Sequence, residues 1–309
     1  MALNQNTKSL IKAVADNNLQ AAKAHVKAIL ANETAQCNKH FVNSIKNKLS
    51  TPTANLMDLP HNIKGMLMVE DVSVSFNNDR YVLSDNSAEV TEKILSTWRT
   101  HERLTEYGIN YLNSTLLYGE SGCGKTMLGR YIAYTAGLPF AYLNFSNIVA
   151  SYLGKTGSNI AAVFDHVAKM KCVFMLDELD AIGLKRGSED IGEMARIVIT
   201  LMQCLDSMDN GAIVLGATNR EDIIDSALKR RFALHHEMGL PDTETRKEIT
   251  RCYFETIPNA AYTEIDLAVF AEKTEGFSCA KVANTVVAGI VKCLTDGKEI
   301  NLRDVIPND

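Results

Sequence analysis

One glycine-rich octet constrains the fold of this chain more than any other stretch of its 309 residues. Residues 119–126 read Gly-Glu-Ser-Gly-Cys-Gly-Lys-Thr, follow an apolar run and precede a helical pattern that begins at Met127. The spacing fits G-x-x-x-x-G-K-[ST], in which glycines let successive backbone N–H groups point at phosphate oxygens and the next helix adds its positive end. The octet therefore predicts a phosphate-binding loop, or P-loop, between a strand and a helix.

The residue types of this loop also predict individual contacts. We expect Lys125 to reach the β- and γ-phosphates of a nucleotide and the Thr126 hydroxyl to hold Mg²⁺. The residues predicted to bind the nucleotide here are Glu120, Ser121, Gly122, Cys123, Gly124, Lys125, Thr126 and Met127.

Charge is distributed unevenly along the chain. Residues 1–66 hold eight lysines against three acids, a net charge of +5, and since the whole chain carries −5 the rest carries −10. A basic head on an acidic body is compatible with an acidic or nucleic-acid partner, and also with a solvated helical surface.

The cysteines and the apolar runs indicate the compartment. The seven cysteines are scattered and never show C-x-x-C spacing, which is typical of a reducing compartment and argues against a disulfide or zinc framework. No apolar stretch approaches about 18 residues, and the polar N-terminus has no signal-peptide pattern. We therefore expect a cytoplasmic protein that does not enter a membrane.

Periodicity divides the chain into three predicted regions. Residues 1–66 read as a helical N-terminal module with a linker, residues 67–241 as a doubly wound α/β domain with a mostly parallel sheet, and residues 242–309 as a small helical lid. The expected strands are 69–76, 115–118, 140–143, 172–176, 212–215 and 234–238.

Two acids end one of these buried strands. Ligands of parallel sheets bind at the carboxyl ends of strands, so Asp177 is placed to complete the Mg²⁺ shell, and Glu178 to orient and polarise an attacking water. These acids follow Lys125 after one strand–helix unit, which supports reading both motifs as one site.

Three further polar residues fit a hydrolytic site. Asn219 follows the strand 212–215 and is expected to place its amide between the γ-phosphate and the water, with a loop asparagine that caps the next helix as the alternative. Arg230 and Arg231 suit phosphate because their planar forks donate two hydrogen bonds at once. They are either trans-acting arginine fingers or cations favoured at a helix end.

Together these motifs resemble those of the AAA+ ATPases, specifically the AAA branch whose hexamers thread or remodel proteins, over roughly residues 80–300. The resemblance implies a P-loop NTPase fold, ATP and Mg²⁺ as cofactors, and Arg230 and Arg231 as the finger pair. The family's spacer between the two arginines is missing, which leaves open which of them reaches the γ-phosphate.

The resemblance adds residues that the motifs alone do not assign. Three residues would lie beside the adenine, namely Tyr107, Gly108 and Ile109. The start of the last long helix would approach the nucleotide by its backbone at Cys279 and Ala280, and Lys281 replaces a family acid there. A substrate-gripping pore loop would comprise Tyr152, Leu153 and Gly154, with 185–187 where a second pore loop would follow.

The function expected from this combination is ATP hydrolysis coupled to remodelling, unfolding or threading of a protein. The resemblance implies a homohexamer with fingers acting in trans, and a protein client or partner bound by the N-terminal module and the central pore. A nucleic-acid motor or loader is one alternative, which the acidic body and the aromatic pore loop disfavour. A nucleotide-gated assembly switch for a partner effector is another.

Overall fold

The computed structural model describes residues 5–15, 25–26, 29–30, 63, 65–151, 156–183, 191–208 and 211–307. Of the predicted N-terminal helices, the first is present as α1 (Gln5–Ala15). Of the second, only residues 25–26 and 29–30 are described, and they are helical, whereas the third falls outside the described residues. The predicted boundaries between the three regions stay predictions. In the described part of the chain no helix is long and apolar enough to span a membrane.

A six-stranded sheet forms the centre of the chain, in the order β1-β3-β4-β5-β2-β6. Only β1 runs antiparallel to its neighbour, so the sheet confirms the predicted mostly parallel α/β fold. The strands are β1 (Leu67–Glu70), β2 (Asn113–Tyr118), β3 (Phe140–Asn144), β4 (Val173–Asp177), β5 (Ile213–Thr218) and β6 (Leu234–Glu237).

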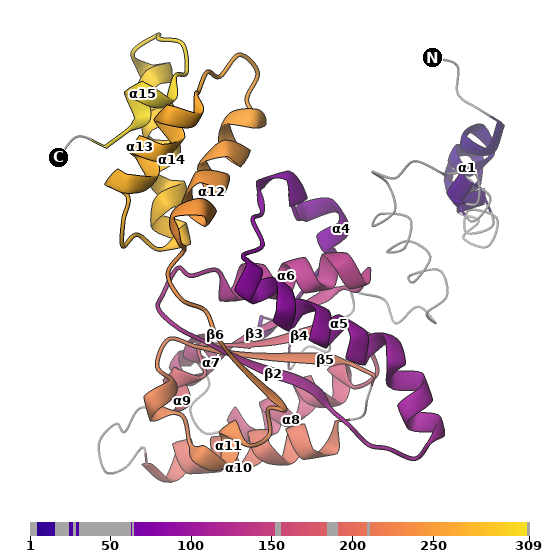
Figure 1. Cartoon of the computed structure of the whole chain (residues 1–309). Helices are drawn as coiled ribbons and strands as arrows, with labels where there is room; N and C mark the ends of the chain where they lie inside the picture. Colours follow the sequence, from indigo (N-terminus) through magenta and orange to yellow (C-terminus); the bar gives the residue numbers. More distant parts are fainter. Residues whose placement is uncertain are drawn as a thin grey trace.

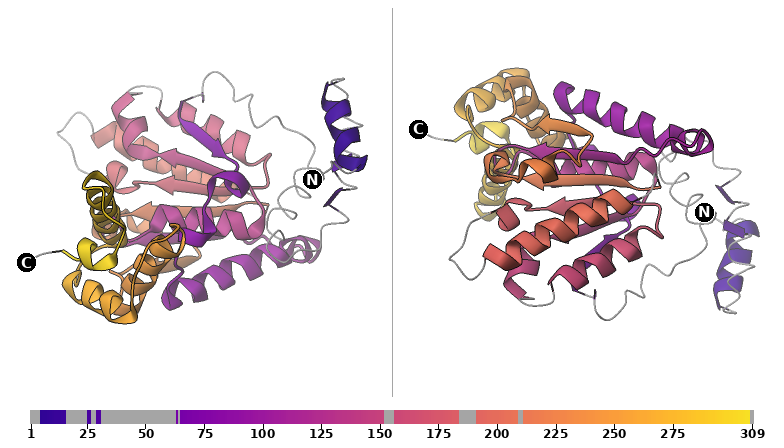
Figure 2. Two further views of the ribbon diagram at one scale, coloured as in Figure 1. Left: turned by 90° about the horizontal axis from the view of Figure 1, so that it is seen from above. Right: turned by 90° about the horizontal axis from the view of Figure 1, so that it is seen from below.

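Helices cover both faces of this sheet (Figure 1). Because successive strand residues point to opposite faces, Leu116 packs under one helical layer and Leu117 under the other. One layer comprises α5 (Asp85–Glu106) and α6 (Lys125–Ala136). The other comprises α7 (Phe145–Ser151), α8 (Thr156–Val167), α9 (Asp180–Gly183), α10 (Ile191–Ser207) and α11 (Ser226–Lys229). Figure 2 shows the molecule from the side of each layer.

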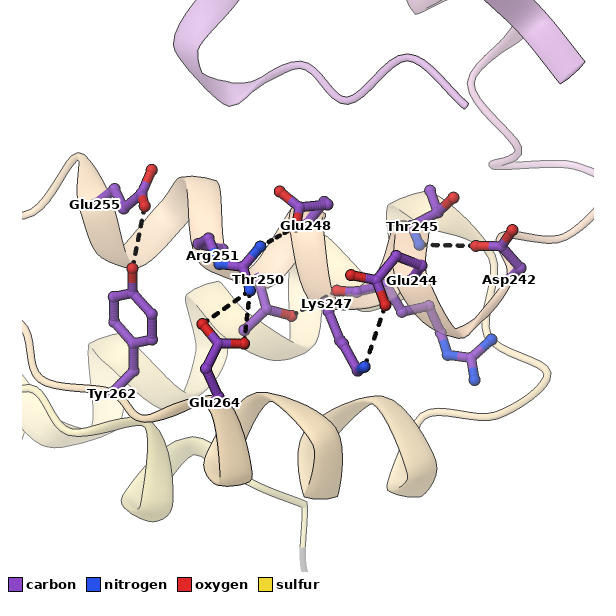
Figure 3. Close-up of polar contacts among 11 residues, drawn as sticks. Asp242, Glu244, Thr245, Lys247, Glu248, Thr250, Arg251, Glu255, Tyr262 and Glu264 are labelled. Atoms are coloured by element: carbon purple, nitrogen blue, oxygen red, sulfur yellow. Dashed lines mark hydrogen bonds and ion pairs between the residues drawn. The ribbon is translucent and has the colours of Figure 1, made fainter. Parts of the chain in front are cut away.

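The last helices form a separate bundle with its own apolar core, and we call this bundle the lid. Its helices are α12 (Thr243–Glu255), α13 (Glu264–Lys273), α14 (Cys279–Thr295) and the short α15 (Leu302–Val305). Phe254, Phe270 and Val286 are fully buried among them. The three long helices agree with the sequence prediction. An ion pair between Arg251 of α12 and Glu264 at the start of α13 links these two helices (Figure 3).

One predicted strand is largely wrong. The strand expected over 69–76 ends at Glu70, and a short helix α4 (Val72–Ser75) follows. Asp71 caps this helix because its carboxylate accepts a hydrogen bond from the Ser73 N–H at 3.2 Å. Val72 and Phe76 are both buried, and a spacing of four residues suits one face of a helical turn. The local cap therefore overrides the apparent alternation.

Candidate active site

The P-loop connects β2 to α6 in a tightly curled path. Gly119 has a φ of 141°. A Cβ atom there would lie 2.1 Å from the carbonyl oxygen of Met238. Gly122 has a φ of 82°, and its Cβ would meet the Ser278 hydroxyl at 2.8 Å. The octet thus needs glycine at both positions, because the exit of β6 and the start of α14 press against the loop. This cradle of close backbone fits a bound phosphate chain.

Lys125 and Thr126 begin α6 directly behind this loop. The Lys125 ammonium is buried and donates hydrogen bonds to the carbonyl oxygens of Gly119 and Glu120, both at 2.8 Å. Burial lowers the pKa of Lys125 from its ordinary value, so the site favours a compensating anion beside this amine. The Thr126 hydroxyl donates to a carboxylate oxygen of Asp177 at 2.8 Å. The two motifs therefore meet in space, as the sequence predicts.

The two acids after β4 have different environments. The second oxygen of Asp177 accepts a hydrogen bond from the Glu178 N–H at 2.8 Å. Glu178 has a φ of 56°, one of two positive values among the non-glycine residues that the structure describes. A left-handed conformation costs an ordinary residue about 1–2 kcal/mol. The surrounding structure holds Glu178 in this strained conformation, and the chain therefore turns away from the direction of β4 at this residue.

Asn219 lies at the same edge of the sheet because β5 is the neighbour of both β4 and β2. Its N–H donates to the Asp180 carboxylate at 3.2 Å. The Thr218 hydroxyl donates to the same oxygen at 3.0 Å. Asp180 thus ties the end of β5 to α9, a role that sequence reasoning missed. The Asn219 side chain makes no helix cap, so that alternative is not what the structure shows.

Two polar residues at the end of β3 also escaped prediction. Asn144 lies opposite Asp177 in the parallel register. Its side-chain amide donates to the Tyr142 hydroxyl at 3.2 Å. Burial raises the pKa of Tyr142, and the nearby charge of Asp177 adds to the shift. The rule that identified Asp177, polar residues at the carboxyl end of a strand, would have found both.

The lid reaches the P-loop through the start of α14. The Ala280 N–H donates to the Gly122 carbonyl at 3.0 Å. The backbone at Cys279 and Ala280 therefore lies beside the P-loop, as the resemblance implies. Burial raises the pKa of the Cys279 thiol to about 11, and the neighbouring Cys123 adds to this. The Lys281 ammonium lies 3.6 Å from the centre of the Phe277 ring.

The segment predicted to lie beside the adenine is elsewhere. The Asn86 amide, at the start of α5, donates to the Glu237 carbonyl at the carboxyl end of β6. The Asn113 amide, at the amino end of β2, donates to Ile94 in the middle of α5. The helix therefore runs past the far edge of the sheet before it reaches Tyr107, Gly108 and Ile109. The expectation that these three residues contact a nucleotide bound in this chain's own P-loop is wrong.

A segment that the motifs did not indicate lies over α6 instead. It runs from α4 through the 3₁₀ helix η2 (Asn78–Arg80), and the Tyr81 ring stacks on Tyr131 of α6 with centroids 4.7 Å apart. Burial raises the pKa of Tyr81, with Tyr131 and Cys279 as its further neighbours. The segment thus bridges the P-loop helix and the lid.

Arg230 and Arg231 lie at the amino edge of the sheet, opposite the P-loop. The Ser114 hydroxyl, one residue into β2, donates to the Arg231 carbonyl at 3.0 Å. The six residues of β2, at about 3.3 Å each, put roughly 20 Å between this edge and the P-loop. The structure therefore does not bring the arginines to the site of their own chain.

Two predicted features stay untested by the structure. Tyr152, Leu153 and Gly154 fall outside the described residues, between α7 and α8, and so does the segment 185–187. Where the structure describes the chain, no group of three or more histidines, cysteines or acids is arranged to hold a metal ion.

Comparison with known proteins agrees with these motifs. A family model described as "ATPase family associated with various cellular activities (AAA)" matches residues 115–240. The "ATP-dependent zinc metalloprotease FtsH 1" of Thermoanaerobacter sp. is 34% identical over 227 residues, which are 71% of this chain and 36% of that protein. A similarly named FtsH of Acidobacterium capsulatum is 32% identical over 243 residues, 76% of this chain and 37% of the relative.

A plant protein shows the same degree of likeness. The chloroplastic "ATP-dependent zinc metalloprotease FTSH 6" of Arabidopsis thaliana is 34% identical over 223 residues, 70% of this chain and 32% of that protein. The chain thus spans about a third of the length of these curated relatives.

Proposed function

The chain belongs to the AAA family of ATPases, in the protein-remodelling branch, and from this premise we propose that it hydrolyses ATP to remodel, unfold or thread a protein client as a ring-shaped oligomer. One observation carries the proposal. The carboxyl edge of the sheet gathers the P-loop, the paired acids and Asn219, while the arginine pair lies at the opposite edge of the same chain.

The hydrolytic roles follow from this arrangement. Lys125 holds the β- and γ-phosphates, and burial favours an anion beside it. Glu178 orients and polarises the attacking water, and Asn219 positions that water against the γ-phosphate. The lid closes over the nucleotide through Cys279 and Ala280, since Ala280 already bonds to the P-loop backbone.

Thr126 and Asp177 are the residues that would hold Mg²⁺. Their oxygens lie 2.8 Å apart, and hydroxyl and carboxylate oxygens are the donors that this hard cation prefers. When bound, the ion neutralises charge that develops on the phosphate oxygens.

A ring explains the position of the arginines. A head-to-tail contact between copies places the amino edge of one sheet against the carboxyl edge of the next and closes into a ring if the rotation permits. Arginine fingers then complete each site in trans, and we propose a homohexamer, following the family resemblance.

A protein is the client that the observations favour. The names of the relatives join ATP use to proteolysis, a reaction of polypeptides. The predicted pore loop Tyr152, Leu153 and Gly154 would grip such a chain by apolar and backbone contact, and the basic N-terminal module would dock it. A cytoplasmic location stays a prediction.

Glu178→Gln tests the assignment of the base. The variant should bind ATP with unchanged affinity but hydrolyse it at least about 10²-fold more slowly, because the amide cannot accept the proton. The matched control is Glu92→Gln, an exposed acid of α5 paired with Arg99, which should hydrolyse ATP at the wild-type rate. Near-normal turnover by Glu178→Gln would remove Glu178 from its proposed role.

The client class is tested with the same protein. An unfolded polypeptide should stimulate ATP hydrolysis by the wild-type chain, and Tyr152→Ala should lose that stimulation but keep the basal rate. Stimulation by DNA that survives Tyr152→Ala and falls steeply with salt would instead favour a nucleic-acid motor.

A further inference from the structure

Three consecutive cations at the end of α11 have different partners. The Lys229 ammonium pairs with Glu221 at 3.0 Å. The Arg231 guanidinium pairs with Asp206 of α10 at 3.1 Å. Arg230, between them, is exposed, and its guanidinium has no hydrogen bond or ion pair within the described part of the chain. The two outer cations are thus fixed to their own protomer, and the middle one is not.

Arg231 is held by three hydrogen bonds. Its Nε donates to Oδ1 and its Nη2 to Oδ2 of Asp206, both at 3.1 Å, and its Nη1 donates to the Ala227 carbonyl at 3.0 Å. This fork-to-carboxylate geometry is the strongest arrangement that arginine makes with an acid. To reach another subunit, Arg231 would have to give up all three contacts.

Arg230 and Arg231 open onto the same cleft of about 370 Å³, which Asp206 also lines together with Asn110 and Tyr111 from the loop that leads into β2. In that cleft Arg231 is paired with Asp206, whereas the Arg230 guanidinium has no such partner among the described residues. Residues adjacent in a helical turn point about 100° apart, and Arg230 has helical backbone angles. Without a spacer between them, the two arginine side chains therefore leave the backbone in different directions.

We propose that Arg230 alone donates to the phosphate oxygens of the nucleotide bound by the adjacent copy of this chain, and that Asp206 is a positioning residue that holds Arg231 back. Arg231 then serves as a structural anchor, which orients the end of α11 through its contacts with Asp206. The inference rests on the proposed ring ATPase, and it assigns the two arginines different tasks in that ring.

The first test compares single variants of the full chain by steady-state ATP hydrolysis. Arg230→Ala should lower kcat by about 10³-fold or more, the size of an arginine-finger effect. Arg231→Ala and Asp206→Ala should each lower it by no more than about tenfold, since they loosen a partly exposed ion pair. The Asp206→Ala/Arg231→Ala double variant should be no slower than the slower single variant, because both remove one contact.

Controls separate this role from a structural one. Arg230→Ala should bind a fluorescent ATP analogue and assemble like the wild type, because the guanidinium it removes makes no hydrogen bond or ion pair with the residues of its own chain that the structure describes. Arg99→Ala removes another exposed arginine, paired with Glu92 at 3.0 Å on α5, and should keep full activity.

Mixing two inactive variants tests action in trans. Arg230→Ala supplies an intact site and Glu178→Gln supplies an intact finger, so co-assembly should restore hydrolysis well above the sum of the separate proteins. Mixing Arg230→Ala with the double variant Glu178→Gln/Arg230→Ala should restore nothing.

The outcomes distinguish the two proposals. If the wild type hydrolyses ATP but Arg230→Ala matches it, or if Arg231→Ala is the more damaging change, the assignment of Arg230 is overturned and the ring ATPase stands. A wild-type chain that does not hydrolyse ATP, or that hydrolyses it as a monomer, contradicts the proposed function itself.

Discussion

At the scale of single residues, one carboxylate organises the hydrolytic edge of the sheet. Asp180 follows the paired acids by two positions and accepts hydrogen bonds from the Thr218 hydroxyl and the Asn219 N–H. The Leu179 N–H also donates to the Ala217 carbonyl at 2.9 Å, so three hydrogen bonds join the start of α9 to the end of β5. The position of Asn219 relative to Glu178 therefore depends on Asp180.

This dependence predicts a contrast between two substitutions. Asp180→Ala should lower kcat about tenfold or more with little change in ATP affinity, because it frees the backbone of Asn219 without touching the P-loop. Asp180→Asn keeps an acceptor oxygen at the same place and should retain most of the activity. Steady-state kinetics and nucleotide titrations check both, and equal losses in the two variants would show that the charge, not the acceptor, matters.

At the scale of elements, the lid is assembled by close backbone approach as well as by apolar burial. Gly289 in the middle of α14 faces α15, and a Cβ atom there would lie 2.5 Å from a Val305 methyl group. The outer side of the bundle is polar: the Tyr262 hydroxyl donates to Glu255 at 3.1 Å, and Arg251 bridges Glu248 and Glu264 (Figure 3). Exposed pairs of this kind add little stability, so the packing of α14 on α15 matters more.

Gly289→Ala should therefore destabilise the lid. Overpacking costs about 1–3 kcal/mol and outweighs the gain of about 1 kcal/mol from alanine's helix propensity. Gly239→Ala is the control, since no atom lies within 4 Å of the added methyl group, and its effect should stay within about 0.5 kcal/mol. Denaturant unfolding measures both. A Gly289→Ala variant as stable as the wild type would mean that α15 can move away without loss.

The elements also show what the sequence could and could not predict. Apolar runs identified β2 to β5, because strands covered on both faces have no polar side to confuse the pattern, whereas β6 is an edge strand with the sequence Leu-His-His-Glu. The strand prediction failed over 69–76 because the alternation of apolar and polar residues there is compatible with a strand. The structure of this segment is instead decided by the hydrogen bond that the Asp71 side chain accepts at the start of α4, which the alternation does not reveal. Motif spacing likewise brought Thr126 to Asp177 correctly.

At the scale of the molecule, the lid and the α/β domain are joined by few polar contacts. Arg80 of η2 donates from Nε to the Thr256 hydroxyl at 2.9 Å, and its guanidinium lies 5.2 Å from the centre of the Tyr253 ring. A second direct link is the hydrogen bond from the Ala280 N–H to the Gly122 carbonyl. Such a sparse junction lets the lid shift relative to the sheet when nucleotide binds between them.

Arg80→Ala should therefore weaken ATP binding about two- to tenfold, since it removes one hydrogen bond and one cation–π contact from this junction. The kcat at saturating ATP should stay within about twofold, because no hydrolytic residue moves. Isothermal titration and kinetics, with Arg99→Ala as the matched control, measure the two effects. Unchanged affinity would show that the junction plays no part in binding.

The molecular scale is also where sequence reasoning failed. The family resemblance placed Tyr107, Gly108 and Ile109 beside the nucleotide, although they precede β2 and so lie at its amino end, whereas the P-loop follows its carboxyl end. Asp206 and Arg231 are 25 residues apart, and no motif spacing connects them. Pairings of this kind depend on how α10 and α11 cross, which only the folded chain reveals.

The placement of the arginine pair roughly 20 Å from the P-loop along β2 has a consequence for regulation by abundance. If the proposed ring is right, a solitary copy would hold nucleotide without consuming it, because the arginine finger would have to come from a neighbour. The rate per copy then rises with protein concentration until every edge is occupied. Dilution alone would silence the enzyme, with no inhibitor, and crowding at one place in a cell would switch it on there.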